Sequence, residues 1–239
     1  MKMRFLTVVV LMLSGVAGAA DYVVPAFAYN LPGHGKNVWT TELYISNPGD
    51  TTVRVDPPTV LEGKLVVPRP CLPPVRPLEV APHSSAIWTS AEIAVQLGCA
   101  EEIVGALLLH ADGEVAIDSR MVNVSGEFGE DEESSPDQVP EVILAGYSQQ
   151  MPGFPVADLP KTPKQLMLPS LIWHRNACGK VAFDSYVGFA NPSEDPVHVT
   201  LDLAPELREA GMLIDGKPVQ LPHTLELPAR SWQQLHVTP

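Results

Sequence analysis

Residues Trp39 to Val55, WTTELYISNPGDTTVRV, set the architecture of this chain, because the same pattern returns as Phe183 to Val199, FDSYVGFANPSEDPVHV. The two stretches align without a gap at a shift of 144 residues. A second shared piece follows, in which Leu78 to Pro82 (LEVAP) matches Leu225 to Ala229 (LELPA) at a shift of 147. Self-similarity of this kind indicates an internal duplication with a loop of variable length between the two shared pieces.

Each copy alternates apolar and polar residues, which is the pattern of a half-buried β-strand. The Asn-Pro pair at 47–48, repeated at 191–192, then ends the strand. Pro has no N–H for the ladder, and Asn supplies turn geometry. Because the alternation resumes at Val53 and Val197, the pattern predicts a hairpin in each copy. In the first copy one face carries Trp39, Thr41, Leu43 and Ile45, and the other carries Thr40, Glu42, Tyr44 and Ser46.

Residues 1–20 have the pattern of a secretory signal peptide. Lys2 and Arg4 precede an apolar run from Phe5 to Leu13, and small residues lead to Ala19 and Ala20. The apolar run is too short for a stable membrane anchor. We therefore expect cleavage after Ala19 or Ala20 and a mature chain that is secreted, in the periplasm or outside the cell, without membrane insertion.

The composition excludes two classes of partner. The chain has 28 acidic and 15 basic residues, a net charge of −13. Nucleic acids and anionic membranes are bound mainly by Lys and Arg, so neither is an expected partner. The 25 Pro, 17 Gly and 6% aromatic residues are typical of many short strands joined by turns. The length suits two modules of roughly 100 residues, each with its own core.

The first module is predicted over residues 21–125. Thr89 is a candidate N-cap for a short helix that ends at Gly98. The Asp-Gly pair at 112–113 predicts a hairpin between two strands in 106–124. A strand with an edge Pro is predicted over 23–29, and the Pro-punctuated stretch 57–77 is interpreted as loop with short extended pieces.

The segment 126–164 is predicted to link the two modules. Residues 126–140 are densely acidic, 141–147 form a predicted strand, and 149–164 are rich in Pro. The acidic run has no regular D-x-D-x-D-G calcium loop, so a solvated loop is the favoured interpretation over a calcium site. No metal site and no cofactor are predicted.

The second module is predicted over residues 165–239 and is shorter than the first. It has no counterpart of the 89–98 helix or of the strands in 106–124. Because folded proteins avoid exposed apolar faces and unpaired strand edges, the missing strands require a substitute. Residues 141–147 or the first module supply it in one hypothesis. In the other hypothesis, a partner chain supplies the substitute strand. A homo-oligomer formed through the edge of the second module is one such arrangement.

The order of these motifs resembles a group of uncharacterised secreted bacterial proteins built of tandem immunoglobulin-like modules. The resemblance covers nearly all of the mature chain and implies an all-β fold of two immunoglobulin-like β-sandwich modules, with one short helix in the first. It implies an exported surface or matrix role and transfers no catalytic residue. Members of that group carry a closing hairpin after the segment matching 225–235, which this chain lacks. The motifs are VPAFAYNLPG, WTTELYISNPGDTTVRV, GALLLHADGEVAIDSRMVNV, FDSYVGFANPSEDPVHVTLDL and LELPARSWQQL.

The chain has three cysteines. In an oxidising compartment Cys71 and Cys99 are candidates for a disulfide within the first module. Cys178 then remains, either as a buried thiol or as the site of an intermolecular bridge.

No motif for catalysis is found in the sequence. The seven His residues show no metal-ligand spacing, and Gly146-Tyr147-Ser148 is followed by Gln149-Gln150, which breaks the nucleophile-elbow pattern. Trp39 and Trp232 are expected at core or strand positions. Trp173, beside the loop 175–179, is the candidate for stacking against a ligand.

The sequence therefore predicts an exported, non-catalytic interaction or scaffold protein of the cell envelope or extracellular space. A protein or a surface polymer is the expected partner. The alternative function is a carbohydrate-binding module of a surface assembly, which Trp173 would serve.

Overall fold

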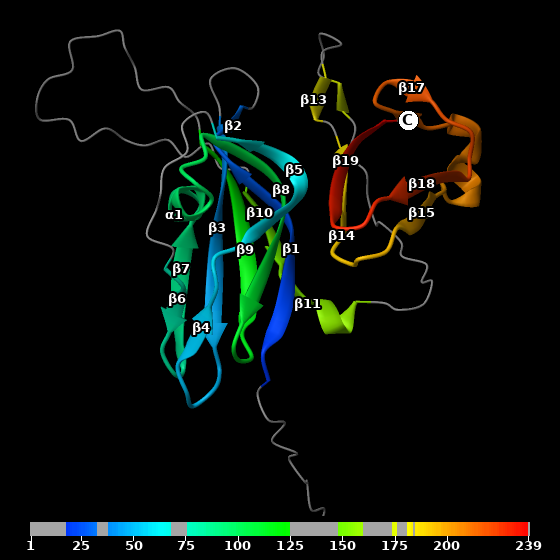
Figure 1. Cartoon of the computed structure of the whole chain (residues 1–239). Coiled ribbons are helices and arrows are strands. Elements are labelled where there is room, and N and C mark those ends of the chain that lie inside the picture. The colour runs from blue at the N-terminus through cyan, green and yellow to red at the C-terminus, as the bar shows by residue number, and fades with distance from the viewer. Residues whose placement is uncertain are drawn as a thin grey trace, which may run out of the picture.

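In the computed structural model, residues 18–32, 38–67, 76–124, 148–159, 174–175, 181–183 and 185–238 are described. They form a mostly β protein with several sheets and one α-helix, which confirms the predicted all-β class. Figure 1 shows the strands gathered in two bodies, with β1 to β11 in one and β12 to β19 in the other. None of the described helices has the length and apolar character needed to span a bilayer.

Two sheets make up the first body. One has the order β11 (Phe154–Pro155), β1 (Ala20–Tyr29), β8 (Glu102–Ala111) and β5 (Thr59–Val66), with β4 (Val53–Val55) beside β8 and β6 (Leu78–Val80) beside β4. The other has the order β10 (Ser148–Pro152), β9 (Ala116–Val124) and β3 (Val38–Asn47). β9 follows one edge of β3 along nearly its whole length, so β2 (Leu31–Pro32) and β7 (Ser84–Thr89) both pair with the opposite edge.

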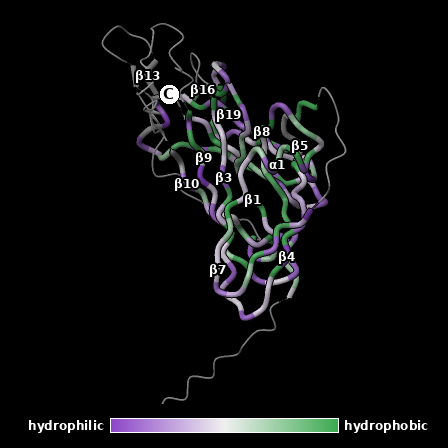
Figure 2. The backbone as a smooth tube through the Cα atoms, turned by 90° about the vertical axis from the view of Figure 1, so that its left-hand side faces the viewer, coloured by the Kyte–Doolittle hydropathy of each residue, from purple (hydrophilic) through white to green (hydrophobic). Residues whose placement is uncertain are grey.

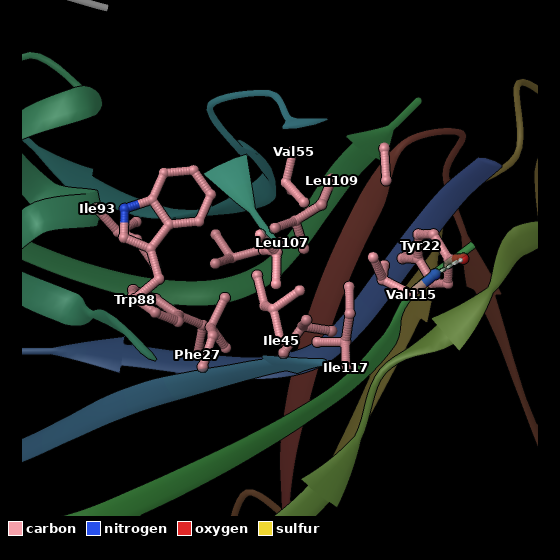
Figure 3. Close-up of a cluster of buried hydrophobic side chains, with 14 of the residues drawn as sticks. Tyr22, Phe27, Ile45, Val55, Trp88, Ile93, Leu107, Leu109, Val115 and Ile117 are labelled. Atoms are coloured by element: carbon pink, nitrogen blue, oxygen red, sulfur yellow. Dashed lines mark hydrogen bonds between the residues drawn. The ribbon is translucent and has the colours of Figure 1, made fainter. Parts of the chain in front are cut away.

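The main core lies between these two sheets. Along β3 the alternation predicted from the sequence is observed, since Thr41, Leu43 and Ile45 are buried. Figure 2 shows hydrophobic and hydrophilic residues alternating along the strands. In Figure 3 the side chains of Ile45 and Leu107, from facing sheets, point into the same cluster. At one end of it the Tyr22 hydroxyl accepts a hydrogen bond of 3.1 Å from the Val115 N–H.

The predicted helix is confirmed as α1 (Ser90–Gln96). Thr89 caps it, and its hydroxyl accepts from the Glu92 N–H while the Glu92 carboxylate accepts from the Thr89 N–H, which is a capping box. The chain leaves the helix through Gly98, whose φ of 85° suits a residue without a Cβ. Buried Ile93 anchors the helix in the main core.

The hairpin predicted at Asn47-Pro48 is wrong, and so is the hairpin predicted at Asn191-Pro192, because the strands on either side of each corner lie in different sheets. β3 and β4 belong to different sheets, so the chain crosses the core at this corner. The Asn47 amide explains the crossing, because Nδ2 donates to the carbonyl oxygens of Thr51 (2.7 Å), Val80 (2.9 Å) and Ala81 (3.2 Å). Its Oδ1 accepts from the Gly49 N–H at 2.9 Å. The corner is thus bonded to the end of β6 rather than folded back on β3.

The hairpin predicted around Asp112-Gly113 is also wrong, because β8 and β9 lie in opposite sheets. The turn is bonded to β4 instead. Asp112 donates its N–H to the Arg54 carbonyl at 3.0 Å, and its Oδ1 accepts from the Arg54 N–H at 2.7 Å. A Cβ on Gly113 would lie 2.8 Å from Val53, so only Gly fits this close approach.

Two further expectations for the first body change. The stretch 57–77 contains the eight-residue strand β5, which pairs with β8, so it is not only loop with short extended pieces. Pro25, predicted at a strand edge, falls where the register of β1 with β8 shifts, while β11 pairs with β1 only at Tyr22 and Val23. A bulge of this kind accommodates a residue that cannot donate to the ladder.

The second body is built around β14 (Ser185–Asn191) and β19 (Ser231–Thr238), which pair antiparallel. β19 also pairs with β16 (Leu213–Ile214), and β16 pairs with β17 (Lys217–Pro218). A separate pair consists of β15 (Val197–Leu201) and β18 (His223–Leu227), and another of β12 (His174–Arg175) and β13 (Val181–Phe183). Buried Met212, Ile214, Leu235 and Val237 form its core. Two 3-10 helices, Val156–Asp158 and Pro205–Ala210, complete the described elements.

The Asn corner occurs twice with the same bonds. Asn191 Nδ2 donates to the carbonyl oxygens of Asp195 (2.9 Å), Leu227 (3.2 Å) and Pro228 (2.8 Å), and its Oδ1 accepts from the Ser193 N–H (3.1 Å). Each partner is the residue that the sequence alignment assigns to a partner of Asn47. The strand registers agree too, because Val53 pairs with Val80 as Val197 pairs with Leu227, and Asn47 with Ser84 as Asn191 with Ser231.

A contact between a basic and an acidic side chain closes each corner. His83 Nε2 lies 2.9 Å from Asp50 Oδ1, and Arg230 Nη2 lies 2.5 Å from Glu194 Oε1 at the aligned positions. His83 and Arg230 share a left-handed backbone, with φ of 50° and 53°. The hydrogen bond from Arg230, and then its positive charge, lower the pKa of Glu194 below its usual range.

We expect Arg230→Asn to raise the pKa of Glu194 back toward the ordinary value of 4.5, because the hydrogen bond and the charge are both removed. Asn tolerates the left-handed backbone, so the turn should persist. A lowered carboxyl pKa stabilises the fold above the ordinary value and loses that contribution as the pH falls. Carboxyl NMR titration of both proteins measures the change, and an unchanged Glu194 pKa would contradict the pairing.

The two bodies are in contact through β19 and through Ala190 of β14. The Trp232 indole N–H donates to the Pro25 carbonyl at 3.0 Å, and Ser231 pairs with Glu62 of β5 in parallel. Trp232 and Ala190 pack on the outer side of the β1–β8–β5 sheet, against buried Val23, Leu61 and Ala106. The bulge at Pro25 thus supplies the acceptor for the second body.

Candidate functional site

The outward face of the β10–β9–β3–β7 sheet carries the polar side chains that sequence alternation places away from the core. The cross-strand register arranges them in rows perpendicular to the strands. In one row Gln150 is opposite Arg120, and Arg120 is opposite Glu42. The next row runs through Pro152, Asp118, Tyr44 and Ile87, and a third through Ala116, Ser46 and Ser85.

Hydrogen bonds connect the first two rows. The Tyr44 hydroxyl donates to Glu42 Oε2 at 2.8 Å, and the Gln150 amide donates to Asp118 Oδ2. The hydrogen bond to Glu42 is the largest cause of a raised Tyr44 pKa, and burial and the Glu42 charge add to it. Arg120 acts in the opposite direction through its own hydrogen bond and charge. Tyr44 therefore stays a neutral hydrogen-bond donor at physiological pH.

A hollow of about 570 Å³ lies over these rows. It is an open depression of the sheet surface that offers one guanidinium, one carboxylate, one amide, one phenol and one hydroxyl group. Its polar groups are carried by the strands β3, β9 and β10 rather than by loops. The lining residues are Tyr44, Ser46, Ala116, Ile117, Asp118, Arg120 and Gln150.

The chemistry of this hollow suits binding. The Ser46 hydroxyl lies 2.7 Å from the Ser85 hydroxyl, so its partner here is another serine rather than a general base. Arg120 and Asp118 carry opposite charges side by side, which favours a neutral polar ligand or a protein surface with both donors and acceptors.

A second hollow, of about 560 Å³, lies where the Asn47 corner meets the Asp112-Gly113 turn. Three carboxylates line it, from Asp50, Asp112 and Glu114. Asp50 is paired with His83, and Asp112 accepts from the Arg54 N–H. Within the described part of the chain, no group of three or more His, Cys, Asp or Glu side chains is arranged to hold a metal ion.

The predicted ligand residue Trp173 lies outside the described residues, as does Cys71. Cys99 is disulfide-bonded, and its pairing with Cys71 stays a prediction. Trp39 lies in β3 and Trp232 in β19, the strand positions expected for them. Trp88 is buried in the main core.

Sequence reasoning missed Tyr44, Asp118 and Arg120 as neighbours. The alternation of β3 already placed Glu42 and Tyr44 on the outward face. The erroneous hairpin, however, paired β9 with β8 and so kept Asp118 and Arg120 away from β3. The signal that would have found the site is the outward period-two polar pattern of β9, Ala116, Asp118 and Arg120, matched to that of β3.

No protein-family model and no curated protein matches this chain. A solved structure described as "Crystal Structure of Thermotoga maritima 1070" is similar over 57% of this chain and 94% of that chain, with 17% sequence identity and a TM-score of 0.35. A similarity at this level carries no argument about the fold or the function of this protein.

Tyr44→Phe should make the protein less sensitive to alkaline pH. The raised pKa means that the folded state holds the phenolic proton more tightly than the unfolded state. This tighter binding of the proton stabilises the fold below the ordinary pKa of 10.0, and the stabilisation is lost as the pH rises through the folded pKa. Urea unfolding from about pH 8 to about pH 11 should show a smaller decline for the variant. Identical declines would contradict the Tyr44–Glu42 bond.

Proposed function

We propose that this protein is an exported, non-catalytic interaction or scaffold protein of the cell envelope or extracellular space. It consists of two immunoglobulin-like β-sandwich modules that arose by internal duplication and are packed as one rigid unit. The observation that carries the proposal is the outward face of the β10–β9–β3–β7 sheet, where Glu42, Tyr44, Arg120, Asp118 and Gln150 form a polar surface on a rigid support.

The modular part of the proposal is supported by the repeated corner. Asn47 and Asn191 each bind three carbonyl oxygens at aligned positions, and the four strands around each corner pair in the same register. Duplication of one ancestral segment explains this many matching contacts more simply than an independent origin of the two corners. The rigid-unit part is supported by the Trp232 contact with Pro25.

The export part of the proposal rests on the signal-like pattern of residues 1–20. β1 begins at Ala20, so cleavage after Ala19 would leave this strand whole. A disulfide at Cys99 is expected in an oxidising compartment and supports the same location.

The test has two stages. Full-length protein with a C-terminal tag should be recovered from the periplasm or the medium with its N-terminus at Ala20 or Asp21. The immobilised mature protein should then retain an envelope protein or polymer, and Arg120→Glu should lose it while Arg54→Glu, an equally charged change in the other sheet, should keep it. An unprocessed cytoplasmic chain would contradict export, and retention that is lost in the Arg54 variant alone would contradict this binding face.

A second candidate function is carbohydrate binding. The hollow combines an aromatic phenol with amide, carboxylate and guanidinium groups, a set that matches the alternating apolar and hydroxyl faces of a sugar. A glycan array that shows binding lost in Tyr44→Ala would favour it at this hollow. Loss in Trp173→Ala alone would instead place the sugar at the predicted residue.

A further inference from the structure

β7 is an edge strand without the usual protection. It pairs only with β3 among the described strands, so the opposite edge of Ser84–Thr89 has no strand beside it in that part of the chain. Exposed edges are normally guarded by Pro, by charged side chains or by very short strands. The sequence of β7, SSAIWT, has six residues, no charge and no Pro.

Several other edge strands in the described part of the chain are guarded. β10, at the other side of the same sheet, ends with Pro152. β11 is the dipeptide Phe154–Pro155, and β17 is the dipeptide Lys217–Pro218. Unlike these strands, β7 has no charged residue and no Pro that would oppose hydrogen bonding to a further strand.

An apolar side chain lies at the centre of this edge. Ile87 is 53% exposed on the outward face, next to Tyr44 on β3. An added strand would therefore find an aliphatic side chain to pack against at the centre of this unguarded edge.

The sequence of β7 is compatible with pairing to β7 of a second copy of this chain. In an antiparallel pair, residues directly opposite share a face of the sheet. A two-fold axis at Ile87 therefore places Ile87 against its own copy, Ser85 against Thr89 and Ala86 against Trp88, with no charged pair. Backbone hydrogen bonds between the two edges would then join two five-stranded sheets into one.

We propose that β7 is the dimer interface of this protein, occupied by β7 of a second copy in antiparallel register about Ile87. The dimer joins the two outward faces, so the two Tyr44 hollows lie on opposite sides of one seam. A polymeric or clustered partner then meets two equivalent sites on one rigid sheet, which strengthens binding without any new contact.

β14 is the competing edge, because it is also uncharged and carries Tyr186, which is 58% exposed. The Ala190 end of β14 is packed against the first body together with Trp232, so a second copy has less of this strand to pair with. β7 lies on the side of the first body away from β14 and β19 (Figure 1). This difference in access favours β7.

Sedimentation equilibrium of the mature full chain tests the proposal. We expect a reversible dimer whose dissociation constant rises by about tenfold or more in Ile87→Lys, because two apolar side chains are lost and two like charges face each other. Tyr186→Lys is the matched control and should leave the dissociation constant unchanged. A monomer at all concentrations, or a dimer weakened by the Tyr186 variant and not by the Ile87 variant, would overturn the proposal.

Cross-linking provides an independent readout that does not rely on weakening the dimer. Opposed Cα atoms of an antiparallel pair lie within disulfide range, so Ile87→Cys should give an oxidised covalent dimer. The parent chain and Tyr186→Cys, oxidised in parallel, report the background from the native cysteines. A yield for the Ile87 variant no higher than this background would contradict the register.

Discussion

Asn47→Asp is expected to lower the free energy of unfolding by about 3 kcal/mol. The Asn47 side chain is 2% exposed and its amide donates to three carbonyl oxygens. A carboxylate of the same shape has no proton to donate and would place negative charge against all three oxygens. The loss should appear as a lower midpoint in urea unfolding with an unchanged slope.

Asn191→Asp should lower the free energy of unfolding by a similar amount. Asn191 is 3% exposed and donates to three carbonyl oxygens at positions aligned with the acceptors of Asn47. Asn30→Asp is the matched control, since Asn30 is exposed and donates one hydrogen bond of 3.1 Å to the Glu101 carbonyl. Its replacement should cost less than about 1 kcal/mol. Equal effects at all three positions would contradict a special role for the corners.

Trp232→Ala has the second-largest expected effect. The substitution removes the hydrogen bond to the Pro25 carbonyl and the apolar contact with Val23, Leu61 and Ala106. We expect a loss of about 2 kcal/mol and the separation of one cooperative thermal transition into two, because the two bodies then unfold independently.

Gln233→Ala, at the exposed neighbouring position of β19, is the control and should keep a single transition. Trp232→Phe should lose less stability than Trp232→Ala and more than Gln233→Ala, because it retains a ring for the apolar contact but has no indole N–H. Scanning calorimetry measures the number of transitions. A single transition in Trp232→Ala, at the parent temperature, would contradict the coupling of the two bodies.

The sequence predicted the local elements well wherever side-chain patterning alone determines them. The alternation of β3 and the short helix α1 with its N-cap at Thr89 are read directly from neighbouring residues. The alignment also predicted which residues would correspond around the two corners. The hydrogen bonds from Asn47 and Asn191 agree with it at all three carbonyl acceptors.

Pairing between strands was not predictable from the same pattern. Alternation gives the face of a strand but not its neighbour, and a chain that crosses between two sheets keeps the same inward residues as one that folds back in a hairpin. The Asn47 side chain decides between the two by bonding to Val80 and Ala81, which lie more than 30 residues away. No local signal reports a contact of that range.

The candidate site could not be predicted without knowing which strands pair. Glu42 and Tyr44 were assigned to the outward face, but Asp118, Arg120 and Gln150 join them only because β9 pairs with β3 and β10 with β9. Trp173, chosen as an aromatic residue beside a loop, lies outside the described residues, so its role stays a prediction.

Hydrogen exchange of the side-chain amides of Asn47 and Asn191, followed by NMR, tests most directly that one corner has been built twice. Both amides are buried, and each donates to three carbonyl oxygens. Both should therefore exchange far more slowly than the amide of exposed Asn30. Slow exchange at Asn47 together with free exchange at Asn191 would mean that the second corner does not form, and the two-module account would be wrong.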